Sequence, residues 1–148
     1  MFLGRFDHTI DAKGRTSVPA QFRDALLGDL RLVLAPYTIY GERCLDVYPH
    51  VEWQKLLERF AVLPQFSAKT VKFQIGYLAR AHPCEIDGPG RILLPPLLRQ
   101  YAGLKKDVVF LGTYTKFRLM DRESWVKVEG EHDAEAAEDA AIYEDLGI

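Results

Sequence analysis

Two short segments of this 148-residue chain place a carboxylate, a glycine and an arginine in the same order. They read Asp11-Ala12-Lys13-Gly14-Arg15 and Asp87-Gly88-Pro89-Gly90-Arg91. An arginine fork can bond O6 and N7 of guanine together, and a lysine meets phosphate as a point charge. One such segment is most simply an exposed turn with solubilising charges. Two segments with the same pattern leave this interpretation and a nucleic-acid contact equally open. The candidate contact residues are Lys13, Gly14, Arg15, Gly90 and Arg91.

Four further charged residues are expected to support these loops. Asp11 and Asp87 most simply close the two turns with their side chains. Arg23 and Arg99 occupy matching places further along the chain. They are expected to support the loops through Asp11 and Asp87, or to contact phosphate. A surface ion pair within each helix is the alternative interpretation.

The sequence predicts no enzyme, metal site, cofactor or small-molecule substrate. The histidines form no pair four residues apart, and there is no C-x-x-C, nucleophile elbow or phosphate-binding loop motif. His82 and Cys84 would share one face of a strand, but a metal needs more ligands. Gly88-Pro89-Gly90 is glycine-rich, but its proline removes an N–H that a phosphate cradle would need.

The two loops belong to a longer internal repeat. Residues 11–19 align with 87–95 at an offset of 76. After a four-residue insertion in the first copy, residues 45–48 align with 117–120 at an offset of 72. Two copies are too few for a solenoid, so the repeat predicts a duplicated unit that folds around one pseudo-two-fold axis.

The sequence of each copy predicts the same order of elements: a strand, the loop, a second strand, a short helix with proline at its first position, two more strands and a closing helix. The predicted strands are 4–10, 15–18, 30–35 and 44–48, then 79–86, 91–94, 108–113 and 116–120. The predicted helices are 19–27 and 50–60, a connecting helix over 68–77, then 95–101 and one beginning near Arg122. Asp29, Gly41 and Gly112 are expected to mark turns.

These elements divide the chain into four parts. The first repeat spans 4–60, a segment with the connecting helix spans 61–78, the second repeat spans 79–128 and an acidic tail spans 129–148. There is no long linker rich in glycine, serine or proline. The two halves are therefore expected to pack as one body.

The net charge of −2 conceals an uneven distribution of charge. Residues 129–148 hold eight acidic residues and no lysine or arginine, so residues 1–128 hold 19 basic residues against 13 acidic ones. The body is therefore mildly basic and compatible with nucleic acid. No apolar run is long enough for a membrane span, and the two cysteines fit a reducing compartment, so a cytoplasmic protein is expected.

The segments MFLGRFDHTIDAKGRTSVPAQFRDAL and DGPGRILLPPLLRQYAG, with the strand–helix units that follow them, resemble the MraZ family from Met1 to about Trp125. The resemblance implies an α+β fold in which two AbrB-like swapped-hairpin halves, with short helices, form one β-barrel about a pseudo-two-fold axis. It also implies a transcription factor that binds short, repeated, guanine-containing boxes upstream of the division and cell-wall gene cluster. Such a regulator often represses its own operon, assembles into a homo-oligomeric ring and associates with the nucleoid.

Carried over to this chain, the resemblance implies that Lys13, Arg15 and Arg91 contact double-stranded DNA. Asp11 and Asp87 fill the acidic place of the motif. The family commonly has lysine where this chain has Pro89, so the second loop lacks one cation.

A protein–protein interaction module is the alternative reading. AbrB-like swapped hairpins also occur in antitoxins that wrap a partner toxin. In that case the acidic tail would be the active segment and would fold on a basic partner.

Overall fold

The computed structural model describes the backbone of residues 1–148 and the side chains of residues 1–135 and 140–148. The side chains of Glu138 and Asp139, within the predicted acidic tail, lie outside the described residues. The strands are β1 (Arg5–Thr9), β2 (Arg15–Ser17), β3 (Arg31–Ile39), β4 (Glu42–Pro49), β5 (His82–Glu85), β6 (Arg91–Leu93), β7 (Asp107–Gly112) and β8 (Phe117–Asp121). The helices are α1 (Ala20–Ala25), α2 (His50–Ala61), α3 (Ala68–Gly76), the 3₁₀ turn η1 (Leu78–Arg80), α4 (Pro96–Tyr101), α5 (Arg122–Ala134) and α6 (Ala136–Asp145).

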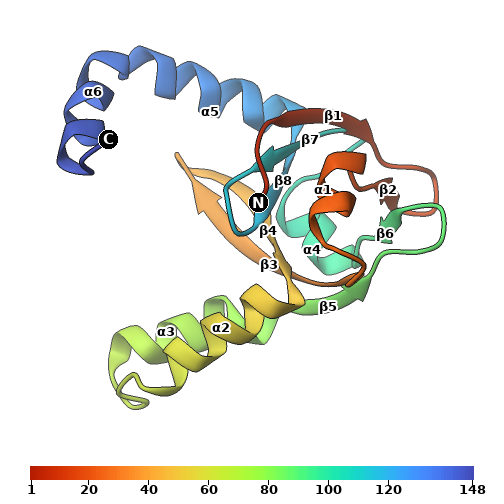
Figure 1. Cartoon of the computed structure of the whole chain (residues 1–148), viewed down its shortest axis with the longest axis horizontal. Helices are drawn as coiled ribbons and strands as arrows, with labels where there is room; N and C mark the ends of the chain where they lie inside the picture. Colours follow the sequence, from red (N-terminus) through yellow and green to blue (C-terminus); the bar gives the residue numbers. More distant parts are fainter.

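Six strands form one antiparallel sheet in the order β1-β7-β8-β4-β3-β5, and β2 pairs with β6 in a separate ribbon (Figure 1). Under the repeat, β1 corresponds to β5, β7 to β3 and β8 to β4, so the order reads the same from either edge. The first strand of each copy pairs with the other copy, since β1 pairs with β7 and β5 pairs with β3. This exchange of strands confirms the predicted α+β fold of two swapped halves.

The pseudo-two-fold axis passes through two residue pairs. Thr16 faces its repeat equivalent Ile92 across the β2–β6 ribbon. Asp46 faces its repeat equivalent Arg118 across β4 and β8. The axis therefore crosses both the ribbon and the centre of the six-stranded sheet.

The main core lies between the six-stranded sheet, the β2–β6 ribbon and the short helices α1 and α4. Its centre is aromatic: the Phe22 ring lies 5.4 Å from that of Phe2 and 4.8 Å from that of Phe117, measured between centroids. Phe22 and Phe117 are fully buried. Burying a phenylalanine contributes about 1.5–3 kcal/mol, so this cluster anchors α1 against the sheet.

The helices α1 and α4 begin one residue later than predicted. Pro19 and Pro95 are the N-caps, with extended ψ angles of 137° and 135°, and do not occupy the first helical position. In the second copy the reason is local, because Pro96 follows Pro95 and a residue before proline is held in the extended region. Pro96 then takes the position in the first turn.

Several element boundaries also differ from the prediction. The strand expected from residue 79 begins at His82, because residues 78–80 form η1. The β3–β4 hairpin is longer than predicted, because Tyr40 and Gly41 both have positive φ and close a two-residue turn.

Gly112 does not mark a turn, and lies at the end of β7. A Cβ at Gly112 would lie 2.5 Å from the backbone N of Leu3, so this glycine allows the N-terminal segment to cross the strand. Its N–H donates to the Gly4 carbonyl at 2.8 Å. The turn of this hairpin follows Gly112, where Thr113 N donates to the Lys116 carbonyl at 3.0 Å.

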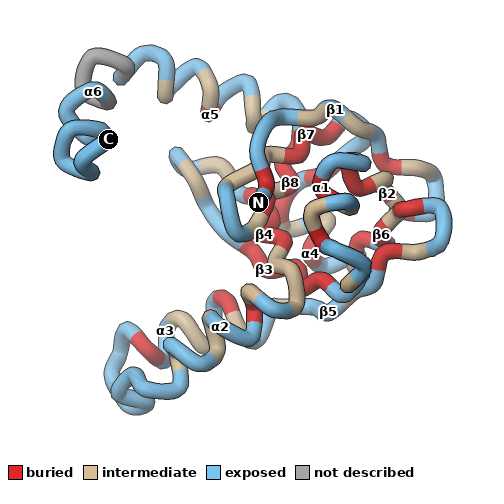
Figure 2. Tube along the Cα trace, viewed as in Figure 1, coloured by how far each residue is buried: buried red, intermediate tan, exposed pale blue. Residues whose placement is uncertain are grey.

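Two helical arms project from the same end of the body (Figures 1 and 2). The arm of α2 and α3 packs on the outer face of β3 through a cluster that includes Trp53 and Tyr77. The helix α5, which leads to α6, packs on a second outer cluster with Trp125, the repeat equivalent of Trp53. The helix α3 confirms the predicted connecting helix, and α5 the helix predicted from Arg122. No helix among the described residues has the length and apolar character needed to cross a membrane.

Candidate nucleic-acid interface

The first loop is held by the carboxylate of Asp11. One of its oxygens, Oδ1, accepts hydrogen bonds from the backbone N–H groups of Lys13 and Arg15, both at 2.9 Å. The other, Oδ2, accepts from Arg15 Nε at 2.9 Å. Gly14 has a φ of +83°, a conformation that glycine adopts at little cost. The predicted closure of the turn by Asp11 is confirmed, and the same carboxylate orients Arg15.

The second loop repeats this geometry with one bond fewer. Asp87 accepts from Arg91 N at 2.7 Å and from Arg91 Nε at 3.1 Å, and Gly90 has a φ of +93°. Pro89 stands where the first loop has Lys13, and proline has no N–H to donate to the carboxylate. The second loop is therefore bonded like the first except at this position.

The two loops lie side by side because their following strands pair. Leu94 N donates to the Gly14 carbonyl, and Val18 N donates to the Gly90 carbonyl, both at 2.9 Å. Figure 1 shows the loops together at the end of the body opposite the two arms. The arrangement places Arg15 and Arg91 on one ribbon, related by the pseudo-two-fold axis.

Arg23 and Arg99 contact the loops by a route that differs from the prediction. Of the two predicted roles, support through Asp11 and Asp87 is not observed, because those carboxylates bind Arg15 and Arg91; contact with phosphate stays a prediction. Arg23 Nη1 instead donates to the Pro89 carbonyl of the opposite loop at 3.3 Å. Arg99 Nη1 lies 3.6 Å from where a Cβ on Gly14 would stand. The helix α1 therefore bonds to the loop of the other copy through Arg23, whereas Arg99 of α4 lies beside the loop of the other copy.

The anchoring of Arg99 also differs from that of Arg23. Its Nε donates to the Leu104 carbonyl at 3.2 Å and its Nη2 to the Lys105 carbonyl at 2.9 Å. These two carbonyls follow α4, so Arg99 fixes the end of its own helix as well as lying beside the first loop. Sequence spacing predicted that Arg23 and Arg99 matter to the loops but could not show that the copies exchange them.

The outer edges of Arg15 and Arg91 remain available to a ligand. Their side chains are 28% and 30% exposed. Among the described residues, hydrogen bonds and ion pairs of each guanidinium involve only Nε, so Nη1 and Nη2 point to no protein acceptor. An arginine held through Nε on a carboxylate keeps two donors for a planar acceptor such as a guanine edge or a phosphate. Lys13 is exposed beside them.

The loop carboxylates are stabilised in their charged form. The backbone N–H of Arg15, followed by its side chain, lowers the pKa of Asp11 below its ordinary value of 3.8. The backbone N–H of Arg91 does the same for Asp87. Both carboxylates are therefore ionised at neutral pH, and both loops remain closed.

The histidines and cysteines of the described residues do not come together as a metal or nucleophile site. No group of three potential metal ligands comes together in the described part of the chain. Burial raises the pKa of the Cys84 thiol to about 12, so it stays protonated at neutral pH. Cys44 is buried, and burial raises the pKa of its thiol to about 12 as well.

Comparison with known proteins gives a consistent result. A family model described as "MraZ protein, putative antitoxin-like" matches residues 1–75 and 77–144. A protein of Thioalkalivibrio sulfidiphilus (strain HL-EbGR7) named Transcriptional regulator MraZ is 39% identical over 153 residues, which cover 100% of both chains. Proteins with the same name from Lachnoclostridium phytofermentans and Thermoanaerobacter sp. (strain X514) are 44% and 38% identical, and cover 84% and 100% of this chain and of their own.

Proposed function

This chain belongs to the MraZ family, and from that premise we propose that it is a sequence-specific regulator of transcription that binds double-stranded DNA. The observation that carries the proposal is the paired ribbon, in which Arg15 and Arg91 are each fixed through Nε while their Nη1 and Nη2 donors stay unbonded by the described residues. The relatives named Transcriptional regulator MraZ support the same reading.

In this proposal Arg15 and Arg91 read guanine edges in the major groove, and Lys13 contacts phosphate. Gly14 and Gly90, also expected at the contact, are buried in the loops, where they allow the tight turn that presents Lys13, Arg15 and Arg91. The chemistry is binding without bond making or breaking. The proposal includes no cofactor, metal or small-molecule substrate.

Affinity in this proposal depends on several copies acting together. One ribbon supplies few phosphate contacts, and binding by few contacts is weak and falls with salt. We propose that the chain assembles as a homo-oligomeric ring, which gives several ribbons a high effective concentration on one duplex. Short guanine-containing boxes spaced about 10 bp apart would then lie on one face of the DNA. The sites proposed are those upstream of the division and cell-wall gene cluster, which places the protein on the nucleoid in the cytoplasm.

Footprinting on the promoter of the protein's own gene at 50 mM and 200 mM salt tests the proposal. We expect protected boxes at regular spacing, with affinity lower at the higher salt. Arg15→Ala is expected to abolish specific protection. The matched control is Arg59→Ala, because Arg59 is an exposed arginine in the last turn of α2, and α2 lies on an arm at the end of the body opposite the loops. Equal footprints for wild type and Arg15→Ala would exclude the ribbon as the reading element.

A protein–protein interaction module is the second candidate, because the matching family model is described as antitoxin-like. The same variant separates the two functions. If the chain is an interaction module that acts through residues 129–148, the Arg15→Ala variant should still bind its protein partner. If the chain is a regulator, the same variant should no longer bind the promoter.

A further inference from the structure

Two cavities meet at Tyr101 and form one groove at the β3–β5 side of the sheet. A cavity of about 620 Å³ lies between η1 and the start of α4, and Ala81, Pro96 and Leu97 contribute to its apolar lining. A second cavity of about 360 Å³ lies between β3 and α3, where Tyr37 and Phe73 line it. Tyr101 lines both, and its hydroxyl lies 3.3 Å from Thr38 Oγ1. We call the two cavities together the Tyr101 groove.

Four cations surround this groove. The guanidinium carbons of Arg43 and Arg80 lie over the Tyr101 ring, 4.9 Å and 5.6 Å from its centroid. Lys69 and Lys72 line the second cavity. None of the four forms an ion pair with any residue whose side chain is described. Like charges that converge on one aromatic ring repel each other, so an anionic occupant would lower the energy of the groove.

The C-terminal segment has complementary chemistry. In residues 140–148, Glu144 and Asp145 lie among exposed apolar side chains. The exposed apolar side chains are Ile142, Tyr143, Leu146 and Ile148. A segment with this pattern can fill an apolar groove while its carboxylates meet the cations at the rim.

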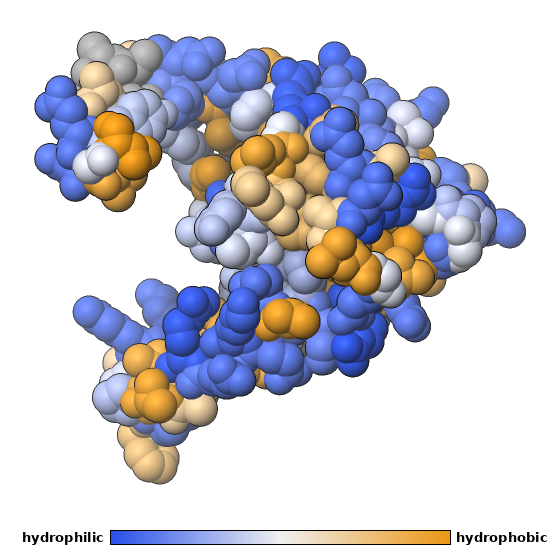
Figure 3. Space-filling view, in the orientation of Figure 1, coloured by the Kyte–Doolittle hydropathy of each residue, from blue (hydrophilic) through white to orange (hydrophobic). Residues whose placement is uncertain are grey.

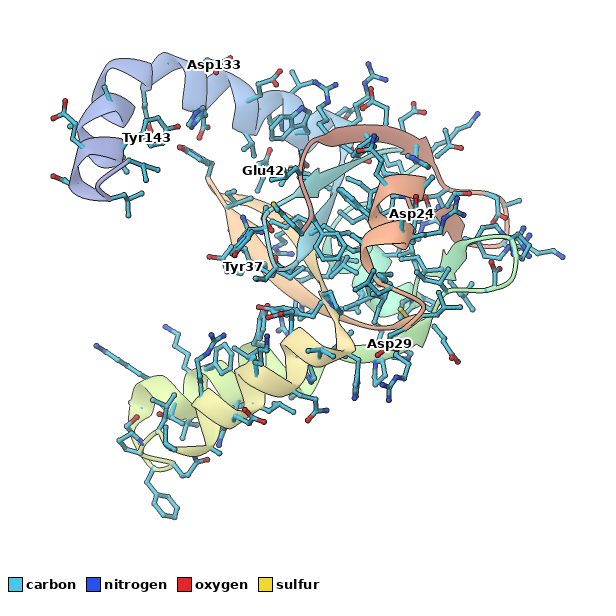
Figure 4. All side chains as sticks on the ribbon, viewed as in Figure 1. Asp24, Asp29, Tyr37, Glu42, Asp133 and Tyr143 are labelled. Atoms are coloured by element: carbon cyan, nitrogen blue, oxygen red, sulfur yellow. The ribbon has the colours of Figure 1, made fainter. Side chains whose placement is uncertain are left out.

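We propose that the Tyr101 groove receives residues 140–148 of a second copy of this chain. The inference rests on the homo-oligomer of the proposed function and deepens it by naming the contact between subunits. The same chain cannot provide the segment in this structure, because α5 packs on β7, β8 and β4 and carries α6 away on the other arm. Figure 3 shows the surface hollowed between the two arms, and Figure 4 labels Tyr37 and Tyr143 on two sides of that space.

A duplex is a less suitable occupant than a polypeptide. Apart from Arg80, His82 and Tyr101, the larger cavity is lined by alanine, proline and leucine. This mostly apolar lining matches apolar side chains better than a phosphodiester, which needs charged or donor groups along its length. A tail of one subunit in the groove of the next is a head-to-tail contact, and such contacts close into rings when the rotation between subunits allows it.

A charge exchange between two variants tests the contact. The groove variant is Lys72→Glu with Arg80→Glu, and the tail variant is Glu144→Lys with Asp145→Lys. Each variant presents like charges to its own copies, so each is expected to self-associate about tenfold more weakly than wild type at 0.1 M salt. Mixed in equal amounts, each variant's tail meets a groove of opposite charge, and the oligomer should form again. Sedimentation velocity measures the mass of each sample.

The control is Arg59→Glu with Arg122→Glu, which changes the charge as much at two exposed positions outside the groove. This control should keep the oligomeric mass of wild type.

Groove and tail variants that assemble like wild type would overturn the inference, as would two dissociated variants that fail to assemble when mixed. A groove variant that keeps its mass but loses promoter affinity would show that DNA occupies the groove. Promoter binding by wild type is measured separately. The proposed regulatory function can therefore be confirmed even if the contact between groove and tail is excluded. A wild-type chain that sediments as one subunit would remove the ring and this contact together.

Discussion

Asp46 and Arg118 occupy equivalent positions in the two copies and meet across the pseudo-two-fold axis, with Arg118 Nε 2.8 Å from Asp46 Oδ1. In a dimer of identical halves the same side chain would face itself at this point. A single chain with two copies can place opposite charges there. Asp46 is 1% exposed and Arg118 16%, and Tyr77 Oη donates to the other carboxylate oxygen at 2.7 Å. The pair therefore makes the two halves chemically different at the centre of the sheet.

Arg118→Ala is expected to destabilise the fold by about 3–5 kcal/mol, because it leaves the buried Asp46 carboxylate without its counter-ion. Urea unfolding measures the loss. The control is the double variant Asp46→Leu with Arg118→Leu, which follows the neighbouring leucine pair Leu45 and Leu119. Replacing both charges by apolar groups should cost much less than removing one. A double variant as unstable as Arg118→Ala would contradict this account.

Thr16→Val is expected to stabilise the protein by about 1 kcal/mol. Thr16 is 1% exposed, and its Oγ1 is buried without a hydrogen-bond partner among the described atoms. A buried unsatisfied hydroxyl costs about 1–3 kcal/mol, and its repeat equivalent Ile92 shows that a branched apolar side chain fits at the axis. Thermal unfolding provides the measurement, and Thr16→Ser, which keeps the hydroxyl and loses the methyl, is the control. A lower midpoint for Thr16→Val than for wild type would contradict the prediction.

Much of the fold can be predicted from local signals in the sequence. The Asp-x-x-Gly-Arg loops depend on bonds within five residues, such as that from Arg15 to Asp11, so the repeat alone predicts them. The helix α2 follows from apolar spacing, and its predicted start at His50 is confirmed. The boundaries of α1 and β5 were less predictable, because a proline cap and a 3₁₀ turn depend on backbone angles that residue types only bias.

Contacts between the copies could not be predicted from residue spacing. Nothing local indicates that Arg23 bonds to Pro89 of the other copy, because the exchange depends on how β1 and β5 cross between halves. The Tyr101 groove was missed for the same reason: Arg43 and Arg80 lie on different elements and meet over one ring only after folding.

Alanine at the two loop glycines is expected to have unequal effects. Gly14 and Gly90 both have positive φ, so each substitution should cost about 1–2 kcal/mol from the backbone alone. At Gly90 the added methyl would also overlap the guanidinium of Arg23, which must then leave the Pro89 carbonyl. At Gly14 the nearest atom, Arg99 Nη1, lies at an ordinary contact distance of 3.6 Å.

A double-mutant cycle measures this difference. Gly90→Ala should couple to Arg23→Ala in the free energy of unfolding, whereas Gly14→Ala should be nearly additive with Arg99→Ala. Equal coupling in the two cycles would contradict the difference between the Arg23–Gly90 and Arg99–Gly14 contacts.

Acid should open the loops. The pKa values of Asp11 and Asp87 are lowered in the folded state, chiefly by the backbone N–H groups of Arg15 and Arg91, so the unfolded chain binds more protons in this range. Their contribution to stability is therefore complete above the ordinary pKa of 3.8 and is lost as pH falls through the lowered values. In urea unfolding from pH 6 to pH 2, wild type should lose stability more steeply below pH 4 than the Asp11→Asn, Asp87→Asn variant. Parallel curves would exclude this role for the two carboxylates.

Pro89→Lys is expected to strengthen promoter binding by restoring two features of the first loop. The new side chain adds a cation at the position equivalent to Lys13, and the new N–H can donate to Asp87, as Lys13 N does to Asp11 at 2.9 Å. One more phosphate contact should steepen the slope of log affinity against log salt by about 0.9. Pro89→Gln restores the N–H without the charge, so it should leave the slope at the wild-type value. Mobility-shift titrations at several salt concentrations compare the three proteins, and equal slopes for the lysine and glutamine substitutions would show that the second loop does not reach phosphate.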